Sequence, residues 1–439
     1  MAKTTSSQET SLKTSIKEAI YMANHIMAKD ILSKIIVDNV PFSLALKQAF
    51  KKGNIAKEDR STVSALVGCA LRHFLVMEKL IKGTYPEIDS EGFIAFLVSF
   101  SNALFIKRFD QAECNATCQS FLKEDDVKVE DFLAPYLEGK KLVPEDIEVG
   151  SLEFLSYRYN TPLSVIKMWN KQFGHVTTSR ILRANSKPAP TVLRINNKLI
   201  SDEDFFNQYP EFEKCDIPGM AFYKGEGKFK NSPANEKNLV SNLPVAFKEM
   251  VDEGDFDLLR GVAVYAEYPN DLLNELLNRF DFLSNIEYVA GSYNACINTK
   301  NFLNKNAVKG VNVYEAGASS IITCISKPVH TFVVLPDSSR LNLLQVLPDY
   351  FLRFDIEKLD ELIANQNKAI NEAANQVEDG GYLLYLVDTI SKKETIGIIN
   401  EFLKEHQEFS LCRDKLYFPY KKFGGSYYFA VLKKEAKND

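Results

Sequence analysis

The feature of this sequence that most restricts its fold is a change in hydrophobic pattern along the chain. In the C-terminal part, short runs rich in β-forming residues alternate with helical runs. Residues 261–266 precede a helical run at 271–280, and residues 286–290 precede another at 293–303. Strands and helices that alternate in this way form βαβ units, so the pattern predicts a mainly parallel, doubly wound sheet. A last β-rich run at 427–432 is expected to add an antiparallel strand.

The N-terminal part has a different period. Apolar residues recur at three- and four-residue spacing from residue 11 to about residue 137, which is typical of amphipathic helices and predicts about six of them. Further helices are expected at 162–173 and 177–185. A Pro-Ala-Pro break then precedes a strand-like run at 191–195, so the helical region is expected to end there.

These patterns predict a multi-domain chain, because 439 residues exceed one ordinary core. We expect an all-α domain over residues 1–140, a small α+β subdomain with its linker over 141–240, and an α/β Rossmann-like domain over 241–439. Residues 218–238 are rich in Gly, Lys and Asn and poor in apolar side chains. This composition is typical of an exposed loop, and we assign it no secondary structure.

Composition limits the class of protein. The 53 Lys and Arg residues face 58 Asp and Glu residues, for a net charge of −5, so contact with nucleic acid has to come from a local patch. The 7 cysteines are scattered without a CxxC pair, so neither a disulfide framework nor a metal site is predicted. The sequence shows no signal-peptide pattern and no run of about 18 apolar residues. We therefore expect a cytoplasmic protein without membrane contact.

The sharpest charge asymmetry lies between residues 161 and 200, which include no Asp or Glu. Clustered cations recognise phosphates, and arginine also stacks on bases, so this stretch predicts an RNA-binding surface within the small subdomain. Its basic residues are Lys167, Lys171, Arg180, Arg183, Lys187, Arg194 and Lys198. Two alternatives stay open: the face is merely solvated, or Arg194 pairs with an interior carboxylate.

Two basic pairs in the N-terminal region extend the predicted RNA-binding residues. They are Arg72 with His73, and Lys107 with Arg108. The cations of either pair also fit a simple role in surface solubility. Trp169 stands at helical spacing with neighbouring apolar residues, which favours core packing over base stacking.

The order of a helical N-terminal domain, a Leu-Arg-Ile-Asn strand and a Rossmann-like domain resembles the bacterial Fmu/Sun-type (RsmB-like) 16S rRNA cytosine-5 methyltransferases. The segments that carry the resemblance occur in the family's order, at 63–80, 162–174, 193–196, 380–385 and 425–430. They cover nearly the whole chain. The resemblance implies a NusB-like first domain, a methyltransferase-type last domain, and RNA as partner, in particular rRNA or a ribosomal particle. It also implies a possible protein partner for the NusB-like domain.

The family's cofactor loop reads D-x-C-A-x-P-G-G-K-T, and residues 264–273 take its place. Only Pro269 of that pattern is kept. Asn270 and Asp271 replace two glycines that let the backbone approach a bound cofactor.

The carboxylates that hold S-adenosylmethionine in the family are also largely missing. The acid that binds the ribose hydroxyls corresponds to Ala290 or Gly291. The acid beside the adenine corresponds to Ala316 or, with a shift of one residue, to Glu315. At most one cofactor carboxylate remains, so we expect no bound cofactor.

Cytosine-5 methylation needs a cysteine thiolate that attacks carbon six of the ring, and a second cysteine assists release in the family. These positions correspond to Ser338 and Asp388. A hydroxyl or a carboxylate does not replace a thiolate, so no catalytic residue is predicted. Cys324 and Cys412 lie outside the expected places, and a packing role is ordinary for cysteine.

The sequence therefore predicts a non-catalytic rRNA-binding protein with the architecture of an S-adenosylmethionine-dependent rRNA cytosine-5 methyltransferase, acting on the ribosome or in its assembly. One alternative is an active enzyme with displaced motifs, which would use S-adenosylmethionine. Another is a protein-interaction scaffold that acts through the NusB-like domain.

Overall fold

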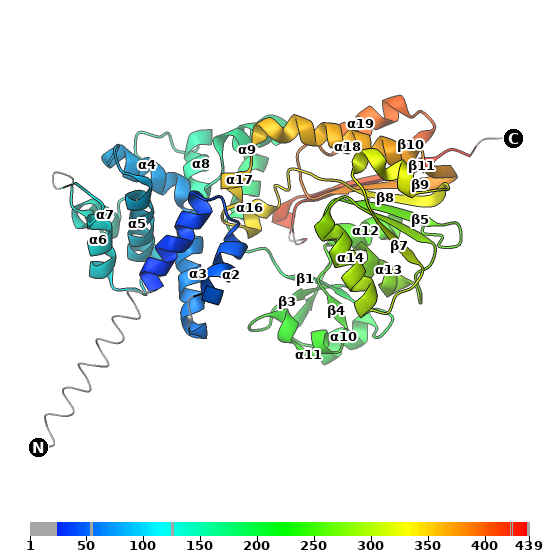
Figure 1. Cartoon of the computed structure of the whole chain (residues 1–439), viewed down its shortest axis with the longest axis horizontal. Coiled ribbons are helices and arrows are strands. Elements are labelled where there is room, and N and C mark those ends of the chain that lie inside the picture. The colour runs from blue at the N-terminus through cyan, green and yellow to red at the C-terminus, as the bar shows by residue number, and fades with distance from the viewer. Residues whose placement is uncertain (1–23, 53–55, 124–126, 422, 424, 437–439) are drawn as a thin grey trace, which may run out of the picture. The chain divides into compact units, whose positions relative to one another are not determined.

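The computed structural model describes residues 24–52, 56–123, 127–421, 423 and 425–436, and these belong to two compact units (Figure 1). The first, here called the helical unit, runs to Leu182 and includes Val346–Phe354. The second, the sheet unit, comprises Arg183–Gln345 and the chain from Asp355 onward. The predicted domain boundaries at residues 140 and 240 stay predictions.

The helical unit has no strand among its described residues, as the apolar spacing predicts. Residues 24–36 form its first described helix. The elements that follow are α2 (Phe42–Lys52), α3 (Lys57–Arg72), α4 (Phe74–Thr84), α5 (Ser90–Ser101), the π-helical turn η1 (Asn102–Ile106), α6 (Gln111–Gln119), α7 (Val129–Leu137), α8 (Leu152–Tyr159), α9 (Leu163–Asn185), which continues into the sheet unit, and α17 (Tyr350–Arg353).

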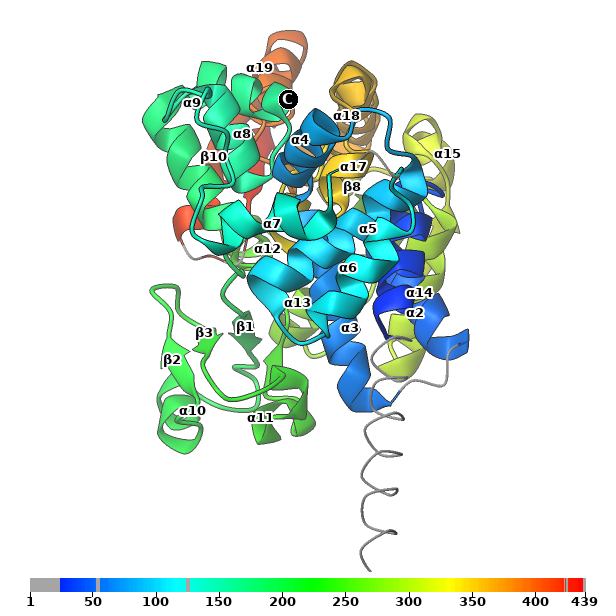
Figure 2. The ribbon, with the colours of Figure 1, turned by 90° about the vertical axis from the view of Figure 1, so that its left-hand side faces the viewer.

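Helix α5 is the core of the helical unit. Its sequence is apolar on all sides, and a helix of that kind is stable only when it is buried. It contacts α3, α4 and α6, which surround it in Figure 2. The helix begins at Asp89, whose Oδ1 accepts a hydrogen bond from the Gly92 backbone N–H at 2.7 Å. Such a cap satisfies one of the unpaired donors at a helix start.

The two helices predicted at 162–173 and 177–185 are found as α9, with a break between them. Gly174 has φ 79° and ψ 166° inside this helix. Glycine adopts a positive φ without the steric cost that a side chain adds. Trp169, in the first segment, is fully buried, which confirms the expected packing role.

A small antiparallel sheet begins the sheet unit, with strand order β2-β3-β1-β4. Its elements are β1 (Val192–Ile195), α10 (Asp202–Gln208), β2 (Phe212–Lys214), β3 (Met220–Tyr223), η2 (Phe229–Asn231), α11 (Pro233–Glu236) and β4 (Val240–Ser241). The prediction of a structureless loop at 218–238 is wrong, because this segment contains β3 and α11. Strand β3 is stabilised by pairing with both β1 and β2. The amino-acid composition of residues 218–238 does not reveal these partner strands.

The main sheet has seven strands in the order β10-β11-β9-β8-β5-β6-β7. They are β5 (Val262–Ala266), β6 (Ile286–Ala290), β7 (Val311–Glu315), β8 (Val329–Leu335), β9 (Val377–Val387), β10 (Phe409–Tyr417) and β11 (Tyr427–Lys434). Strands β5 to β9 are parallel, and β11 runs antiparallel to both β9 and β10. The predicted parallel sheet with an antiparallel last strand is confirmed.

Helices cover both faces of this sheet. Those that pack on the first face are α12 (Val245–Glu253), α13 (Leu272–Arg279) and α14 (Tyr293–Lys305). The other elements are η3 (Ala318–Ser320), α15 (Ile321–Cys324), α16 (Leu343–Val346), η4 (Ile356–Lys358), α18 (Leu359–Ala374), α19 (Ile396–Glu405) and η5 (Pro419–Lys421). Of these, α15, α18 and α19 pack on the second face.

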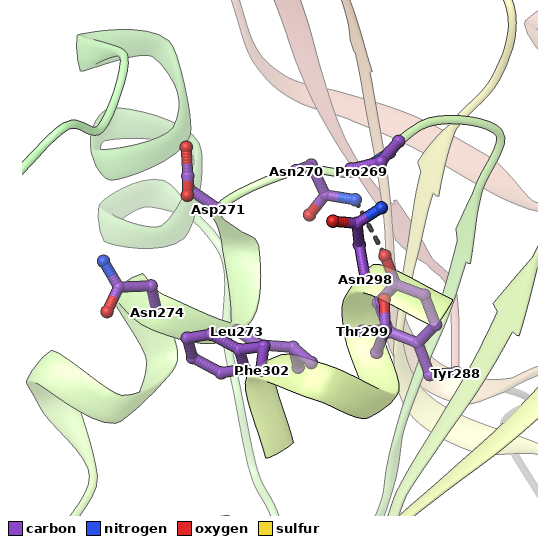
Figure 3. A pocket seen from close by; sticks show the side chains of 9 residues that line it. All are labelled: Pro269, Asn270, Asp271, Leu273, Asn274, Tyr288, Asn298, Thr299 and Phe302. Carbon is purple, nitrogen blue, oxygen red and sulfur yellow. Dashed lines mark hydrogen bonds between the residues drawn. The ribbon is translucent and has the colours of Figure 1, made fainter. Parts of the chain in front are cut away.

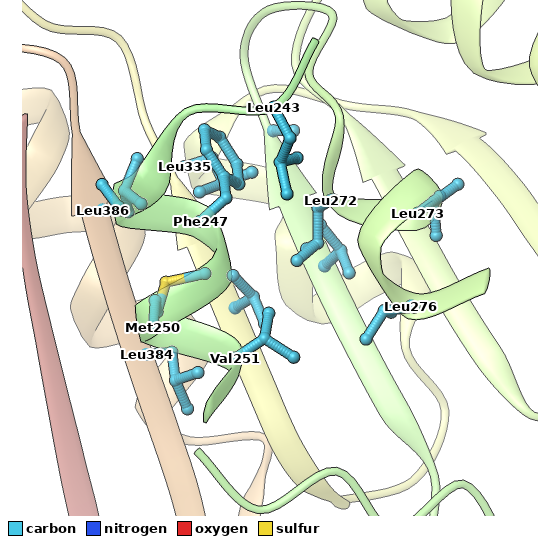
Figure 4. Packing of buried hydrophobic residues seen from close by; sticks show 14 of the residues in the cluster. Leu243, Phe247, Met250, Val251, Leu272, Leu273, Leu276, Leu335, Leu384 and Leu386 are labelled. Atoms are coloured by element: carbon cyan, nitrogen blue, oxygen red, sulfur yellow. The ribbon is translucent and has the colours of Figure 1, made fainter. Parts of the chain in front are cut away.

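Strand β5 shows how one sequence supplies two cores. Val262 and Val264 belong to the apolar cluster on the first face (Figure 4), whereas Ala263 and Tyr265 belong to the cluster on the second. Successive side chains of a strand point to opposite faces, so a strand covered on both sides has to be apolar throughout. This explains the continuous apolar run of β5.

No helix in the described part of the chain combines the length and the apolar character that crossing a membrane requires.

Candidate functional site

The candidate site lies at the carboxyl ends of the parallel strands. Strand β5 pairs with β6 on one side and with β8 on the other, and the chain proceeds in opposite directions from it. Open α/β sheets bind ligands outside the carboxyl ends of the strands at such a switch point. The loops after β5, β6, β8 and β9 therefore form the candidate site.

The Glu267 side chain occupies the space between the ends of β5 and β6. Its Oε2 accepts a hydrogen bond from the Tyr265 hydroxyl at 2.7 Å. A Cβ atom added to Gly291 would overlap the same Oε2, which shows how closely the carboxylate approaches the backbone after β6. Burial, and then the bond to Glu267, raise the pKa of Tyr265 well above its usual range. A carboxyl group therefore lies where the family resemblance expects room for a cofactor.

The Asn270 side chain ties down the loop after β5. Its Nδ2 donates to the Tyr288 hydroxyl at 2.8 Å (Figure 3). Its Oδ1 accepts from the Leu272 backbone N–H at 3.1 Å. The neighbouring Asp271 is exposed, but partial desolvation of its carboxyl raises the pKa of that group. The loop that the family builds from glycines is here held by side chains.

These residues border a pocket of about 340 Å³, lined by the loop and by α13, β6 and α14 (Figure 3). Its polar lining includes the side-chain amides of Asn270, Asn274 and Asn298. Such groups donate and accept hydrogen bonds but are neither nucleophiles nor bases at neutral pH. The pocket offers polar contacts from these amides, and the carboxyl group of Asp271 also lines it.

Ser338 and Asp388, the two residues expected at the family's cysteine positions, lie side by side. The Ser338 hydroxyl donates to Asp388 Oδ1 at 2.6 Å, and Arg340 Nε donates to Asp388 Oδ2 at 3.1 Å. The Arg340 backbone N–H also donates to Ser338 Oγ at 3.2 Å. The Ser338 hydroxyl thus donates its hydrogen to a carboxylate, and the same carboxylate of Asp388 forms an ion pair with Arg340.

The same cluster extends to the loop after β5. The Arg340 guanidinium lies 4.4 Å from the ring centroid of Tyr268, and the Tyr268 hydroxyl bonds to the Asp337 carboxylate. Burial is the largest influence on both groups and raises the pKa of each. We call this set the closing network: Tyr268, Asp337, Ser338, Arg340 and Asp388. It connects the ends of β5, β8 and β9 through polar contacts and contains no thiol or imidazole.

The buried carboxylate of Glu394 holds the loop that carries Asp337 and Ser338 of the closing network. Glu394 Oε1 accepts from the Ser339 backbone N–H at 2.6 Å, and its Oε2 accepts from the Ser339 hydroxyl at 2.7 Å. Gln366 Nε2 donates to Glu394 at 3.2 Å and to the Asp337 carbonyl at 2.9 Å. Burial raises the pKa of Glu394. No local sequence signal marks Glu394, because Ser339 and Gln366 come from another loop and from α18, although Thr389 of its own loop also donates to it at 3.4 Å.

Nine of the ten predicted RNA-binding residues are exposed. The stretch from 161 to 200 crosses from the helical unit into the sheet unit, so its members divide between them. In the helical unit the exposed residues are Arg72, Lys107, Arg108, Lys167, Lys171 and Arg180. In the sheet unit they are Arg183, Lys187 and Lys198. Lys198 forms an ion pair with Asp281 at 3.4 Å.

Arg194 does not belong to that surface. Its side chain is 6% exposed and its Nε lies 3.0 Å from Oε2 of Glu275, whose side chain is fully buried. The expectation that Arg194 binds RNA is therefore corrected in favour of the alternative, pairing with an interior carboxylate. The physical reason is that β1 is buried along its whole length, so a charge on it requires an interior partner.

The two cysteines weighed as displaced nucleophiles lie away from the closing network. Through the register of β10, β11 and β9, Cys412 is about level with Leu383. Asp388 follows the far end of β9, roughly 16 Å further along at 3.3 Å per residue. Cys324 ends α15 and precedes the start of β8, whereas Ser338 follows its end.

The strand order, with β11 inserted antiparallel between β9 and β10, defines a Rossmann-like methyltransferase fold with a helical region before it. The crystal structure of PH0851 matches 94% of this chain with 99% of its own, at a TM-score of 0.72 and 19% identity. NSun6 from Pyrococcus horikoshii with SFG matches over 64% of this chain and 100% of its own, at a TM-score of 0.56 and 11% identity.

A methyltransferase homolog protein from Pyrococcus horikoshii matches over 66% of this chain and 100% of its own, at a TM-score of 0.54 and 13% identity. No family model matches the sequence, and no curated protein matches it. At these identities the similarity shows the fold.

Proposed function

We propose that this protein binds RNA, in particular rRNA or a ribosomal particle, and does not catalyse methyl transfer. The observation that carries the proposal is the bond between Ser338 and Asp388 at 2.6 Å. The resemblance assigns these two residues to the positions of the family's cysteines, and neither side chain supplies a thiolate. Without a thiolate, the ring carbon that takes the methyl group is not activated.

The cofactor side of the site supports the same conclusion. Glu267 fills the space beside Gly291, and Asn270 holds the loop where the family has glycines. A cofactor bound there would have to displace a carboxylate and break the bond to Tyr288. The protein is therefore expected to bind S-adenosylmethionine weakly or not at all.

RNA as the ligand is supported by the exposed cations of α9 and by the resemblance to rRNA methyltransferases. Lys167 and Lys171 lie four residues apart on the first segment of α9, and therefore on one face of the helix. Arg183 lies on the second segment and Lys187 just beyond its end. The resemblance also assigns a NusB-like fold to the helical region, as a second contact for RNA or protein.

The test uses the full chain and two measurements. Titration calorimetry with S-adenosylmethionine is expected to show no binding at micromolar concentration, and micromolar binding would contradict the proposal. The affinity for rRNA fragments is then measured against salt concentration. Lys171→Glu and Arg183→Glu are each expected to lower the salt slope by about 0.7–0.9 per lost phosphate contact.

The matched control is Lys305→Glu, which makes the same charge change at an exposed lysine on α14 outside the predicted surface. It is expected to leave the slope unchanged. Equal losses in all three variants would mean that RNA responds only to net charge. Methyl transfer from S-adenosylmethionine to RNA would instead favour the active alternative.

A further inference from the structure

A π-helical turn shapes one surface of the helical unit. Element η1 (Asn102–Ile106) follows α5 directly, and Lys107 after it has a φ of 54°. The Asn102 side chain holds this turn: its Nδ2 donates to the Phe109 carbonyl at 3.1 Å, and its Oδ1 accepts from the Arg108 backbone N–H at 3.2 Å. Single π turns are rare and frequently mark functional sites, because they re-aim the side chains around them.

The turn directs the Phe105 ring onto the His73 ring. The two ring centroids are 4.1 Å apart and the planes differ by 4°. In a parallel stack one face of each ring is covered, yet Phe105 remains 39% exposed. Part of Phe105 therefore stays open to solvent although His73 covers one face of its ring. Burial, together with the nearby charge of Arg72, lowers the pKa of His73 to about 4, so its imidazole is uncharged at neutral pH.

Three cations stand next to these rings in the chain. Arg72 precedes His73, while Lys107 and Arg108 follow Phe105 closely. All three side chains are exposed, and none forms an ion pair with a carboxylate of the described residues. The acid closest in sequence, Asp110, uses its Oδ1 to cap α6. The stack thus joins a segment that carries Arg72 to a segment that carries Lys107 and Arg108, more than thirty residues further along the sequence.

We infer that Phe105, backed by His73, is a stacking platform for an unpaired base of single-stranded RNA, with Arg72, Lys107 and Arg108 on the flanking phosphates. An aromatic face within a cationic surface is the arrangement that binds single-stranded nucleic acid, since every base has a π face. Paired bases keep their faces covered, so a duplex cannot use it. This inference rests on the proposed function and adds the kind of RNA to it.

The test uses the full chain and a short single-stranded oligoadenylate that carries 2-aminopurine, whose fluorescence changes when its stacking changes. Phe105→Leu is expected to weaken binding about tenfold, or about 1.4 kcal/mol, and to abolish the fluorescence change. The salt slope stays as in the wild type, because no charge is lost. Phe105→Trp keeps an aromatic face and is expected to retain both affinity and signal.

Thermal unfolding of each variant checks that the helical unit is intact. Arg72→Gln provides a second test that leaves the rings in place, and it is expected to lower the salt slope by about 0.7. If Phe105→Leu binds the oligonucleotide as the wild type does, while Lys171→Glu and Arg183→Glu bind rRNA less tightly, the platform is refuted and the proposed function stands. If the wild-type chain binds no RNA, both are refuted.

Discussion

Replacing Arg194 by alanine separates an interior charge from an RNA contact. Arg194 Nε lies 3.0 Å from Oε2 of Glu275, with side-chain exposures of 6% and 0%. The alanine variant leaves a carboxylate in the core with Arg279 as its remaining cation, at 2.8 Å. We expect a large loss of stability in the sheet unit and no change in the salt dependence of RNA binding.

The size of the loss follows from burial. Removing one partner of a buried ion pair costs about 3–5 kcal/mol. Arg279 is partly exposed and also pairs with Asp252 at 2.6 Å, so it compensates part of the Glu275 charge. We therefore expect about 3 kcal/mol, from the low end of that range. In a unit of this size, that loss lowers Tm by about 6–12 °C.

The assay is urea unfolding of the wild type, Arg194→Ala, and the double variant Arg194→Met with Glu275→Met. The double variant is expected to recover most of the lost stability, because no unpaired charge remains in the core. RNA affinity is measured in parallel on folded protein. Arg183→Ala is the matched variant, since Arg183 is exposed. This variant is expected to keep the Tm of the wild type and to show a weaker salt dependence of RNA binding.

Two results would refute this reasoning. Arg194→Ala with wild-type stability but a reduced salt slope would place Arg194 on the RNA rather than in the core. A double variant as unstable as the single one would show that the unpaired charge does not determine the loss, and that the packing of Arg194 or its hydrogen bonds to Asn197 and Gly219 do.

Three further predictions concern the sheet unit. Burial raises the pKa of Glu394 above its ordinary 4.5, so the folded state binds the proton more tightly than the unfolded state does. The free energy of unfolding of the wild type is therefore expected to fall as the pH rises above that value. In urea unfolding, Glu394→Gln is expected to remove this pH dependence, and an unchanged pH dependence would contradict the prediction. Ser338→Cys combined with Asp388→Cys restores no transfer of labelled methyl groups, because the cofactor loop stays closed; measurable transfer would show otherwise. Gly381→Ala brings a Cβ within 2.6 Å of a β8 carbonyl oxygen and is expected to cost about 1–3 kcal/mol of stability. Gly380→Ala, at a residue with a positive φ, is expected to cost about 1 kcal/mol. Thermal unfolding of the two variants compares these losses, and Gly381→Ala is expected to lose more.

The basic stretch shows how far sequence reasoning about the site could go. Six of its seven cations are exposed, but Arg194 is buried. The composition of the stretch treats all seven alike. What distinguishes Arg194 is the carboxylate of Glu275, which lies 81 positions away in the chain and is held on α13. Charge periodicity cannot report a partner at that distance.

The sequence analysis did not predict strands β3 and β10. The four residues of β3 lie among Gly, Lys and Asn, and β10 alternates little, since its middle residues are largely exposed. Strand β3 is held by hydrogen bonds to β1 and β2 on its two sides, and β10, at the edge of its sheet, is held by hydrogen bonds to β11. By contrast, the local sequence alone predicts a long apolar helix such as α5 and a continuous apolar strand such as β5.

The sequence by itself determined the helical first part, the alternation that builds a parallel sheet, and the absence of thiols at residues 338 and 388, because each depends on residue type or local period. Tertiary structure alone decided that Ser338 and Asp388 bond to each other, that Glu267 fills the space beside Gly291, and that the His73 and Phe105 rings stack. The Ser338–Asp388 bond and the ring stack join residues that are far apart in the chain. Contacts of that kind exist only once the backbone has brought their elements together.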